Sequence, residues 1–272
     1  MVGSSLLVAV NGIGAGFVDF FNQQFSNLAP NLLFVSSVQQ SQDSGAGGGI
    51  GTGTSTPSAK ITLNSAVVNR IKSLPFVEEV IPSYQSQVTI ESQGKSKSNS
   101  VLSIDPTKLL VIAPTLEFAE GSAIRQNDPS AMIVARDMAN PPGEDTPFIT
   151  LGQSVRAKYS FVDPDTGKSE EDTKNFVVRG IMESTGNPTI DGAAVINTDS
   201  GNSFLKKSGK FDSLFVAAES SEFVDPVEDE IRQLYGNDIG ITTVKAILKT
   251  IEQFTGGINA FLSSIAIVSL VV

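Results

Sequence analysis

The chain has 272 residues, long enough for one large domain or two modest ones, and its hydrophobic content of 40% is typical of a folded protein. Its net charge of −10 argues against binding to nucleic acid or anionic lipid, which requires clustered Lys and Arg. Histidine and cysteine are absent, which excludes a Ser-His-Asp triad, a cysteine nucleophile, a typical zinc site and any disulfide. Ser/Lys, carboxylate-pair or tyrosine catalysis and an all-oxygen metal site remain open.

Both ends of the chain carry apolar runs. Residues 2–21 have no charge before Asp19 and could cross most of a hydrocarbon core of roughly 30 Å. The run from Ile258 to Val272 is uncharged and too short to span, as the first part of a membrane helix would be. A cleaved signal peptide is the alternative at the N-terminus, but its basic start and Ala-x-Ala-like exit are absent. The pattern predicts a domain held outside the membrane between two helices.

The first polar part of the chain predicts a unit of strand, helix and strands. Its elements are a strand over 31–38, a Gly/Ser/Thr-rich loop over 41–59, a helix that begins at Thr62 or Asn64 and ends at Pro75, and strands over 76–81 and 87–90. The loop has almost no large apolar side chain, so we expect it to be flexible.

A similar unit returns near the C-terminus. It consists of a strand over 214–218, a helix opened by Pro226 and capped by Ser221 or Asp225, and a strand over 239–244. Two such units commonly pair as a split α+β sandwich with the helices on one face of the sheet.

The region between the units, 106–209, is dominated by short strand patterns. They lie at 131–135, 154–159, 176–181 and 193–196, separated by turns rich in Asn, Asp, Pro and Gly. We therefore expect an α+β fold in which a small β-rich lobe interrupts a split βαβ lobe.

Two glycine-rich motifs suggest nucleotide binding but have simpler interpretations. The motif Gly12–Gly16 has Phe17 where a dinucleotide fingerprint requires a third glycine, and it follows a helical run. Small residues that let membrane helices pack closely explain it better. The glycine run at 45–53 lacks the Gly-Lys-Ser/Thr ending of a phosphate loop and is interpreted as a linker. Asn11 and Asp19 could face a partner helix, but Asp19 lies near the end of its run, which favours the membrane interface.

The segment Asp163–Gly167 spaces its carboxylates as a calcium loop does. Lys168 and Lys174 stand where an EF-hand requires Gly and Glu, so a solvated hairpin tip is favoured. The acidic run 170–172 continues this tip, and weak calcium binding stays open.

Two further pairs consist of residue types that occur in catalytic sites, but they are not placed as a catalytic pair requires. Glu78 and Glu79 are neighbours on a strand and point to opposite faces, which excludes an acid/base pair. Ser92 and Lys95 spell Ser-x-x-Lys, but in a glycine turn rather than on a helix. We therefore expect no catalytic residue, no cofactor-binding residue, no metal-ligating residue and no enzymatic activity.

Several stretches follow one another along the chain in a characteristic order: MVGSSLLVAVNGIGAGF, NLLFVSS, LNSAVVNRIKSLPFVEEVIP, VLSIDP, Glu120-Gly121, AMIVARDMA, LGQSVRAKY, FVVRGIME and FTGGINAFLSSIAIVSLVV. Taken in this order, they resemble the periplasmic core of MacB/FtsX-like ABC transporter permeases. The resemblance covers essentially the whole chain and depends on the order of the stretches, since each alone is weak. It implies a MacB-type periplasmic core domain with stumps of its flanking transmembrane helices, without the remaining membrane helices of the family.

The resemblance also implies a division of the chain into five parts. These are 1–24, the end of transmembrane helix 1; 25–105, the first half of a porter-like lobe; 106–209, an inserted β-rich lobe; 210–250, the second half of the porter-like lobe; and 251–272, a juxtamembrane helix and the start of transmembrane helix 2.

The function implied is that of an extracytoplasmic domain in the cell membrane. Helices over 17–28 and 245–257 would couple ATP-driven membrane-helix movement to the outer lobes, for export or extraction of a substrate. The partners implied are the membrane, a cytoplasmic ABC ATPase subunit, a second permease copy in a homodimer, and an extracytoplasmic adaptor or substrate protein. The loop 41–59 departs from the family where an adaptor would dock.

Two alternatives stay open. One is an FtsX-type scaffold that binds and regulates an extracytoplasmic partner such as a cell-wall hydrolase. The other is a secreted enzyme with carboxylate or Ser/Lys chemistry, which requires ionisable residues that converge in one pocket.

Overall fold

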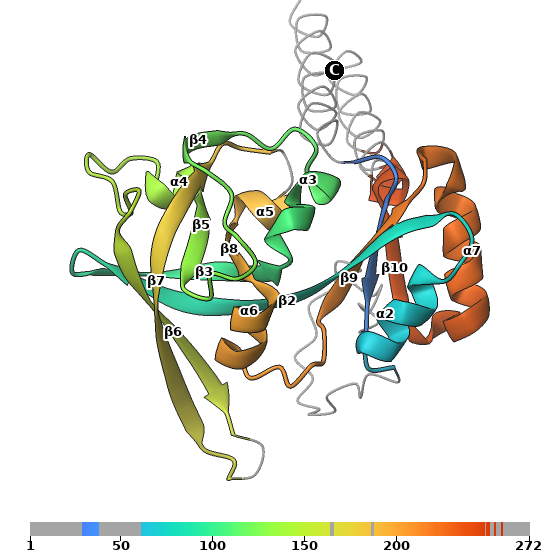
Figure 1. Cartoon of the computed structure of the whole chain (residues 1–272), viewed down its shortest axis with the longest axis horizontal. Coiled ribbons are helices and arrows are strands. Elements are labelled where there is room, and N and C mark those ends of the chain that lie inside the picture. The colour runs from blue at the N-terminus through green and yellow to red at the C-terminus, as the bar shows by residue number, and fades with distance from the viewer. Residues whose placement is uncertain are drawn as a thin grey trace, which may run out of the picture.

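The computed structural model describes residues 29–37, 61–163, 166–185 and 188–247, together with 249, 250, 253 and 257. These residues form two lobes that share one long strand (Figure 1). Several of the predicted features lie outside the described residues: the apolar runs, the glycine motifs, Asn11, Asp19, the loop 41–59, the helix expected at 17–28 and part of the one at 245–257. Among the described helices, none combines the length and the apolar character needed to cross a membrane.

The first lobe is an antiparallel sheet with two helices on one face. Its strands lie in the order β10-β1-β9-β2 and are β10 (Gly240–Thr243), β1 (Leu32–Ser36), β9 (Ser213–Ala218) and the first half of β2 (Val77–Ser92). Helix α2 (Ser65–Lys72) connects β1 to β2, and helix α7 (Val224–Tyr235) connects β9 to β10. The split βαβ arrangement predicted from the sequence is confirmed.

The two helices pack through apolar side chains that recur at helical spacing. Ile71 of α2 and Val227 and Ile231 of α7 are buried against Leu33 and Val35 of β1. These contacts fix both helices to the same face of the sheet, while their charged residues point to solvent.

The first residues of α2 and α7 show where a capping residue in the sequence was sufficient to predict the start of a helix. Asn64 caps α2 as predicted, since its side chain accepts from the backbone N–H groups of Ala66 and Val67. The predicted start of α7 is wrong: the helix begins at Val224, after a 3-10 turn, η2 (Ser221–Phe223), and no side chain caps it. Pro226 lies in the first helical turn, where its missing N–H costs no intrahelical hydrogen bond.

The second lobe is a closed ring of strands. In order around the ring these are the second half of β2, β3 (Lys95–Ile104), β8 (Ala193–Asn197), β5 (Ala131–Ala135), β7 (Ser169–Met182) and β6 (Ser154–Val162), which pairs again with β2. Strand β4 (Phe118–Gly121) pairs with β7 outside the ring. The predicted β-rich lobe is thus present, and its ring also includes β3 and half of β2, which precede residue 106.

Short helices lie in the connections between the strands of the ring. They are η1 (Pro106–Lys108), α3 (Leu109–Ile112), α4 (Arg136–Ala139), α5 (Pro188–Asp191) and α6 (Thr198–Phe204), and η3 (Gly236–Asp238) follows α7 in the first lobe. Helix α6 lies against β3, where Gly201 allows the close approach.

Strand β2 is continuous where the sequence predicts two strands. Its central residues are polar and include Pro82, which interrupts the apolar alternation. The backbone remains paired because β9 covers one edge of β2 as far as Ser83 and β3 covers the other edge from Tyr84. The change of partner carries the strand from one lobe into the other.

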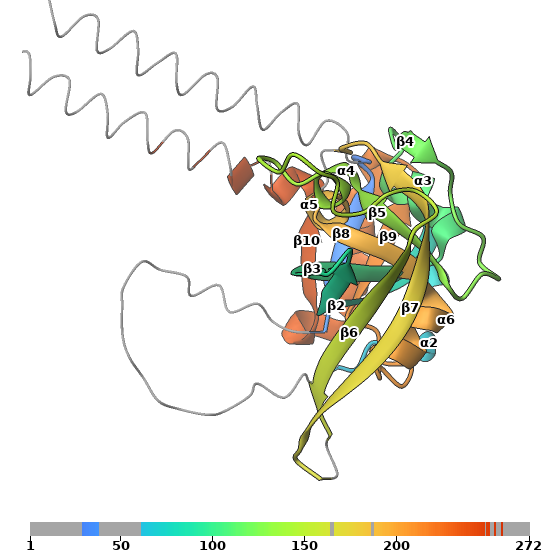
Figure 2. The ribbon, with the colours of Figure 1, turned by 90° about the vertical axis from the view of Figure 1, so that its left-hand side faces the viewer.

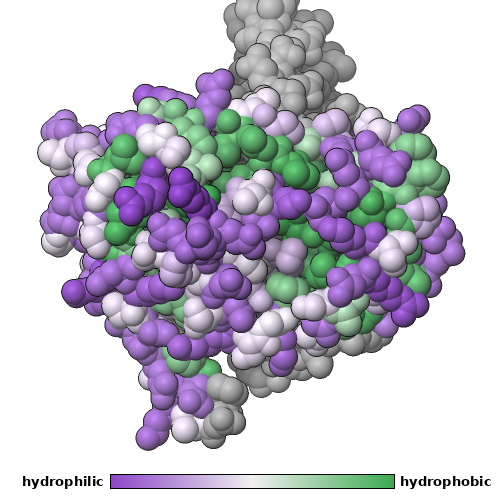
Figure 3. Space-filling view, in the orientation of Figure 1, coloured by the Kyte–Doolittle hydropathy of each residue, from purple (hydrophilic) through white to green (hydrophobic). Residues whose placement is uncertain are grey.

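The two lobes share buried apolar side chains. Leu32, Ile81 and Phe215, on the sheet face opposite α2 and α7, belong to the same apolar cluster as the interior of the ring. Helix α3 contacts β9 at this interface. Figure 3 shows hydrophobic residues at the surface in the region of α3, where Leu110 is 59% exposed.

The outer halves of β6 and β7 form an arm that projects from the ring (Figures 1 and 2). From Tyr159 to Val162, β6 pairs with β7, whereas its described pairing with β2 is confined to 156–158. The predicted hairpin tip is confirmed, since Asp163 accepts hydrogen bonds from the backbone N–H groups of Thr166 and Gly167.

Candidate functional site

The chain enters and leaves the first lobe on neighbouring strands. Leu33 of β1 pairs with Thr243 of β10, the last residue of that strand. Paired strands lie roughly 4.8 Å apart. The start of β1 and the end of β10 therefore lie side by side at one end of the sheet, where the two strands adjoin in Figure 1.

The exit from β10 contains no intervening loop, because residues 244–247 are already helical. Thr243 is buried, and its Oγ1 accepts a hydrogen bond from the Ala246 N–H at 3.0 Å. Lys245 Nζ lies 2.7 Å from Asp225 Oδ2 on α7. A cap and an ion pair thus fix the first turn of the exit helix to the lobe.

The beginning of β1 is also held. The Asn31 side chain donates from Nδ2 to the Ala218 carbonyl at 2.6 Å, and the Ala218 N–H donates to the Asn31 carbonyl at 2.9 Å. The chain is therefore hydrogen-bonded to β9 one residue before β1 begins.

The chain crosses between the lobes at two adjacent points, which we call the crossing: Ser83–Gln85 and Asp212–Ser213. Ser83 Oγ lies 2.7 Å from Ser213 Oγ, and the Asp212 N–H donates to the Ser83 carbonyl at 3.0 Å. The Asp212 carboxylate accepts from the Gln85 N–H at 2.8 Å and pairs with Lys207 at 2.9 Å. These bonds join the two passing segments into one narrow connection.

Glu79 connects the lobes at a second place. Its Oε1 lies 2.6 Å from Lys72 Nζ on α2, and its Oε2 lies 2.6 Å from Lys108 Nζ on η1 in the second lobe. Burial raises the pKa of Glu79, but the hydrogen bonds from Lys108 and Lys72 outweigh it and lower the pKa to about 2. The bond to Glu79 in turn raises the pKa of Lys108.

Glu78 forms no ion pair with Lys72 or Lys108, which both bind Glu79. The register of β2 against β9 shifts between Val77 and Glu79, as at a β-bulge, and Glu78 is exposed. Glu79 is bound by two lysines, and the register shift at Glu78 interrupts the regular alternation of faces on which the sequence-based exclusion of an acid/base pair depends.

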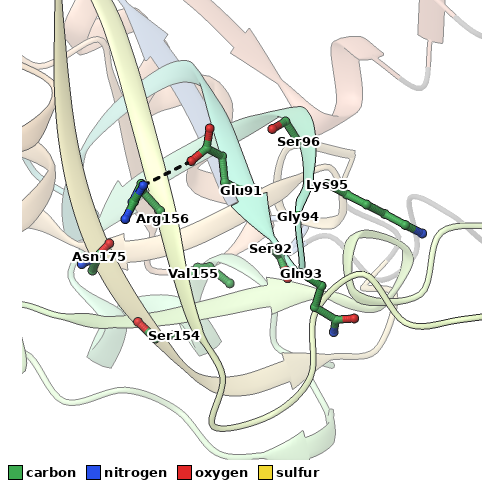
Figure 4. Close-up of a pocket in the computed structure, with 10 residues that line it drawn as sticks. All are labelled: Glu91, Ser92, Gln93, Gly94, Lys95, Ser96, Ser154, Val155, Arg156 and Asn175. Atoms are coloured by element: carbon green, nitrogen blue, oxygen red, sulfur yellow. Dashed lines mark ion pairs between the residues drawn. The ribbon is translucent and has the colours of Figure 1, made fainter.

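A polar groove of about 480 Å³ lies at the β2–β3 hairpin (Figure 4). It is lined by Glu91, Ser92, Gln93, Gly94, Lys95, Ser96, Ser154, Val155, Arg156 and Asn175. Glu91 is held by Lys158 at 2.7 Å and by Arg156 at 3.8 Å. Its single carboxylate is therefore already neutralised by neighbouring cations.

The structure does not bring Ser92 and Lys95 together. Ser92 Oγ donates to the Phe148 carbonyl and accepts from Gln153 Nε2 at 2.8 Å. Lys95 points away from Ser92 in Figure 4 and pairs with Glu144 at 2.9 Å. The Ser-x-x-Lys spelling therefore lacks the contact that activates a serine nucleophile.

The acidic residues of the arm are spread along it. Residues 170–172 lie within β7 and not in the tip, so that part of the prediction is wrong, and Asp172 pairs with Lys206 after α6. Within the described parts of the chain, no three potential metal-ligating side chains converge.

Sequence reasoning missed the polar contacts that join the elements. Glu79 lies seven residues after Lys72 and 29 residues before Lys108, and the three follow no local pattern, so only the folded structure shows that they meet. Thr243 did carry a signal, since a threonine before a helical pattern is a common cap.

Three comparisons place the chain among known proteins. Residues 1–234 match the family model of the MacB-like periplasmic core domain. An uncharacterized ABC transporter permease of Methanocaldococcus jannaschii is 22% identical over 279 residues, which cover 100% of this chain and 62% of that protein. The crystal structure of the periplasmic region of MacB from Actinobacillus actinomycetemcomitans has a TM-score of 0.54 at 14% identity and covers 84% of this chain and 95% of that one.

A further similar structure is the extracellular domain of the noncanonic ABC-type transporter YknZ from Gram-positive bacteria. Its TM-score is 0.48 at 14% identity, with 67% of this chain and 90% of that chain covered. The likeness to the MacB region shows a common fold, and the chain spans 62% of the length of the archaeal permease. Since the family model matches most of its residues, the chain belongs to the family of MacB-like periplasmic core domains, which are domains of ABC transporter permeases.

Proposed function

We propose that this chain is the extracytoplasmic domain of a permease that couples ATP-driven movement of membrane helices to its outer lobes, for export or extraction of a substrate. The observation that carries the proposal is the attachment of both chain ends to adjacent strands, β1 and β10. Movement of one end relative to the other shears this strand pair, and the sheet leads through β9 to β2.

The path from the chain ends to the second lobe consists of hydrogen-bonded strands. Strand β2 extends from the first sheet into the ring, so a displacement of the sheet reaches the ring along one backbone. The proposed assembly is a membrane-embedded homodimer with cytoplasmic ABC ATPase subunits, which supply the energy.

The experiment uses the full-length permease with its ATPase in lipid nanodiscs. This chain has no cysteine, so in a full-length permease whose other cysteines are replaced, Asp229→Cys on α7 and Asp137→Cys on α4 introduce one labelling site in each lobe. Both positions are exposed. We expect the distance between spin labels at these positions to change when a non-hydrolysable ATP analogue binds. An unchanged distance distribution would contradict the coupling.

The arm favours a second candidate, an FtsX-type scaffold that binds an extracytoplasmic partner. It extends away from the end of the sheet where the chain enters and leaves (Figure 2), and Val162 on it is 66% exposed. Replacing residues 160–171 by a short glycine turn distinguishes the candidates. A scaffold loses capture of its partner and keeps nucleotide-dependent lobe movement, whereas a transporter in which the arm has no role keeps both transport and movement.

A further inference from the structure

The two lobes are joined covalently in one narrow place and by an ion pair in another. The crossing holds both covalent passages, through Ser83 and Ser213. Glu79 lies four residues earlier on β2, which places it roughly 13 Å from the crossing along the extended strand. Resistance to rotation about a narrow connection grows with distance from it, so an ion pair at Glu79 is well placed to oppose movement of the lobes.

The two lysines on Glu79 come from different lobes. Lys72 belongs to α2, in the same lobe as Glu79, whereas Lys108 ends η1 in the second lobe. Each occupies its own carboxylate oxygen, and the Val80 N–H also donates to Oε1 at 3.3 Å. Lys72 and Val80 thus orient the carboxylate, and Oε2 is directed to Lys108.

The environment of Glu79 makes the bond to Lys108 stronger than an ordinary surface pair. The Glu79 side chain is 17% exposed and that of Lys108 is 36% exposed. Partly buried pairs are screened less by water and salt than fully exposed ones. Lys108 is followed directly by α3, whose Leu109 and Ile112 are buried in the apolar cluster that spans the lobes.

We propose that Glu79 and Lys108 form a latch that holds the two lobes in one mutual orientation, with the crossing as the hinge. Glu78 and Asp105 also lie near Lys108 and add to the negative potential around its ammonium group. Opening the latch frees the second lobe to rotate about Ser83 and Ser213 against the shared apolar contacts. The role of the latch in transport rests on the proposed function, whereas its effect on lobe orientation does not.

The test compares single lysine substitutions in the full-length permease labelled through Asp229→Cys and Asp137→Cys, without nucleotide. Lys108→Met removes the bond between the lobes, so we expect the distance distribution to broaden or shift. The matched control is Lys95→Met, which removes a lysine pair with Glu144 within the second lobe. It is expected to leave the parental distribution. Lys108→Arg keeps the charge and is expected to preserve it as well.

Equal broadening by Lys95→Met and Lys108→Met would overturn the latch, because it would indicate a general response to the loss of a paired surface lysine. An unaltered distribution in Lys108→Met would also overturn it. Thermal unfolding of each variant shows whether it is folded, and Glu79→Gln replaces Lys108→Met if the latter does not fold. The distance distribution of the parent is then measured again with the nucleotide analogue. If nucleotide does not shift the distribution of the parent, while Lys108→Met broadens it without nucleotide, the proposed coupling is refuted and the latch is retained.

Discussion

Glu79 shows how burial and ion pairing oppose each other at a single carboxyl group. Partial removal from water favours the protonated form, whereas two ammonium groups at hydrogen-bonding distance favour the charged form. The lysines prevail and bring the pKa from the ordinary 4.5 to about 2. The carboxylate therefore stays charged at neutral and at mildly acidic pH.

The lowered pKa of Glu79 predicts a specific loss of stability in acid. Its folded pKa of about 2 lies below the ordinary value of 4.5, so the unfolded chain binds more protons between these pH values. The stabilising contribution is complete above about pH 4.5 and is lost as the pH falls towards 2. We expect it to be about 1–2 kcal/mol, after discounting the pKa shift for the exposure of the lysines.

Urea unfolding of the parent and Glu79→Gln at pH 7, 4 and 2.5 measures this contribution. The difference in unfolding free energy between the two proteins should be largest at pH 7 and should shrink at the lowest pH. A difference that is independent of pH would show that the charge of Glu79 does not stabilise the fold.

Gly201 is required by the packing of α6 on β3. A Cβ atom at this position would lie 2.0 Å from Ser103 Oγ and 2.2 Å from Ser103 Cβ. Ser103 is buried and donates to the Asn197 carbonyl, so it has little freedom to move. We expect Gly201→Ala to lower the free energy of unfolding by about 1–3 kcal/mol. Denaturant unfolding measures it, with the exposed Ser203→Ala on the same helix as a control that should change little.

At the scale of elements, the sequence predicted the strands and helices better than their partners. Local signals mark both ends of α2, since Asn64 caps its start and Pro75 follows its end. The apolar runs of β5 and β8 identify buried strands. The continuity of β2 was missed because it depends on a change of partner at Ser83. The closure of the ring was missed for the same reason: Thr89 pairs with Lys158, and no local pattern encodes that choice.

The connection between β10 and the exit helix predicts a local effect of removing its cap. Thr243→Val keeps the shape of the side chain but removes the oxygen that accepts from the Ala246 N–H. Loss of such a cap costs about 0.5–2 kcal/mol, so we expect hydrogen exchange of the Ala246 amide to accelerate roughly tenfold. The exposed neighbour Thr242→Val is the matched control. Equal exchange in both variants would show that the cap does not hold the helix start.

At the scale of the molecule, the sequence predicted two lobes and the resemblance predicted their family. The contacts that join the lobes were not predictable, because Lys108, Asp212 and Glu79 belong to separate elements that meet only after folding. The first sheet, β2 and the ring nevertheless form one continuous hydrogen-bonded path. Such a path transmits displacement only while each joint in it is stiff.

The stiffness of the joint after β10 is testable by insertion. Three residues, Gly-Ser-Gly, placed between Val244 and Lys245 would separate the exit helix from its cap at Thr243 and its ion pair with Asp225. We expect the full-length permease to retain ATP hydrolysis but to lose the nucleotide-dependent change in distance between the lobes. The same insertion after Gly143, in an exposed loop of the second lobe, should leave that change intact. If both insertions left the change intact, displacement would have to reach the lobes by a route that does not include β10.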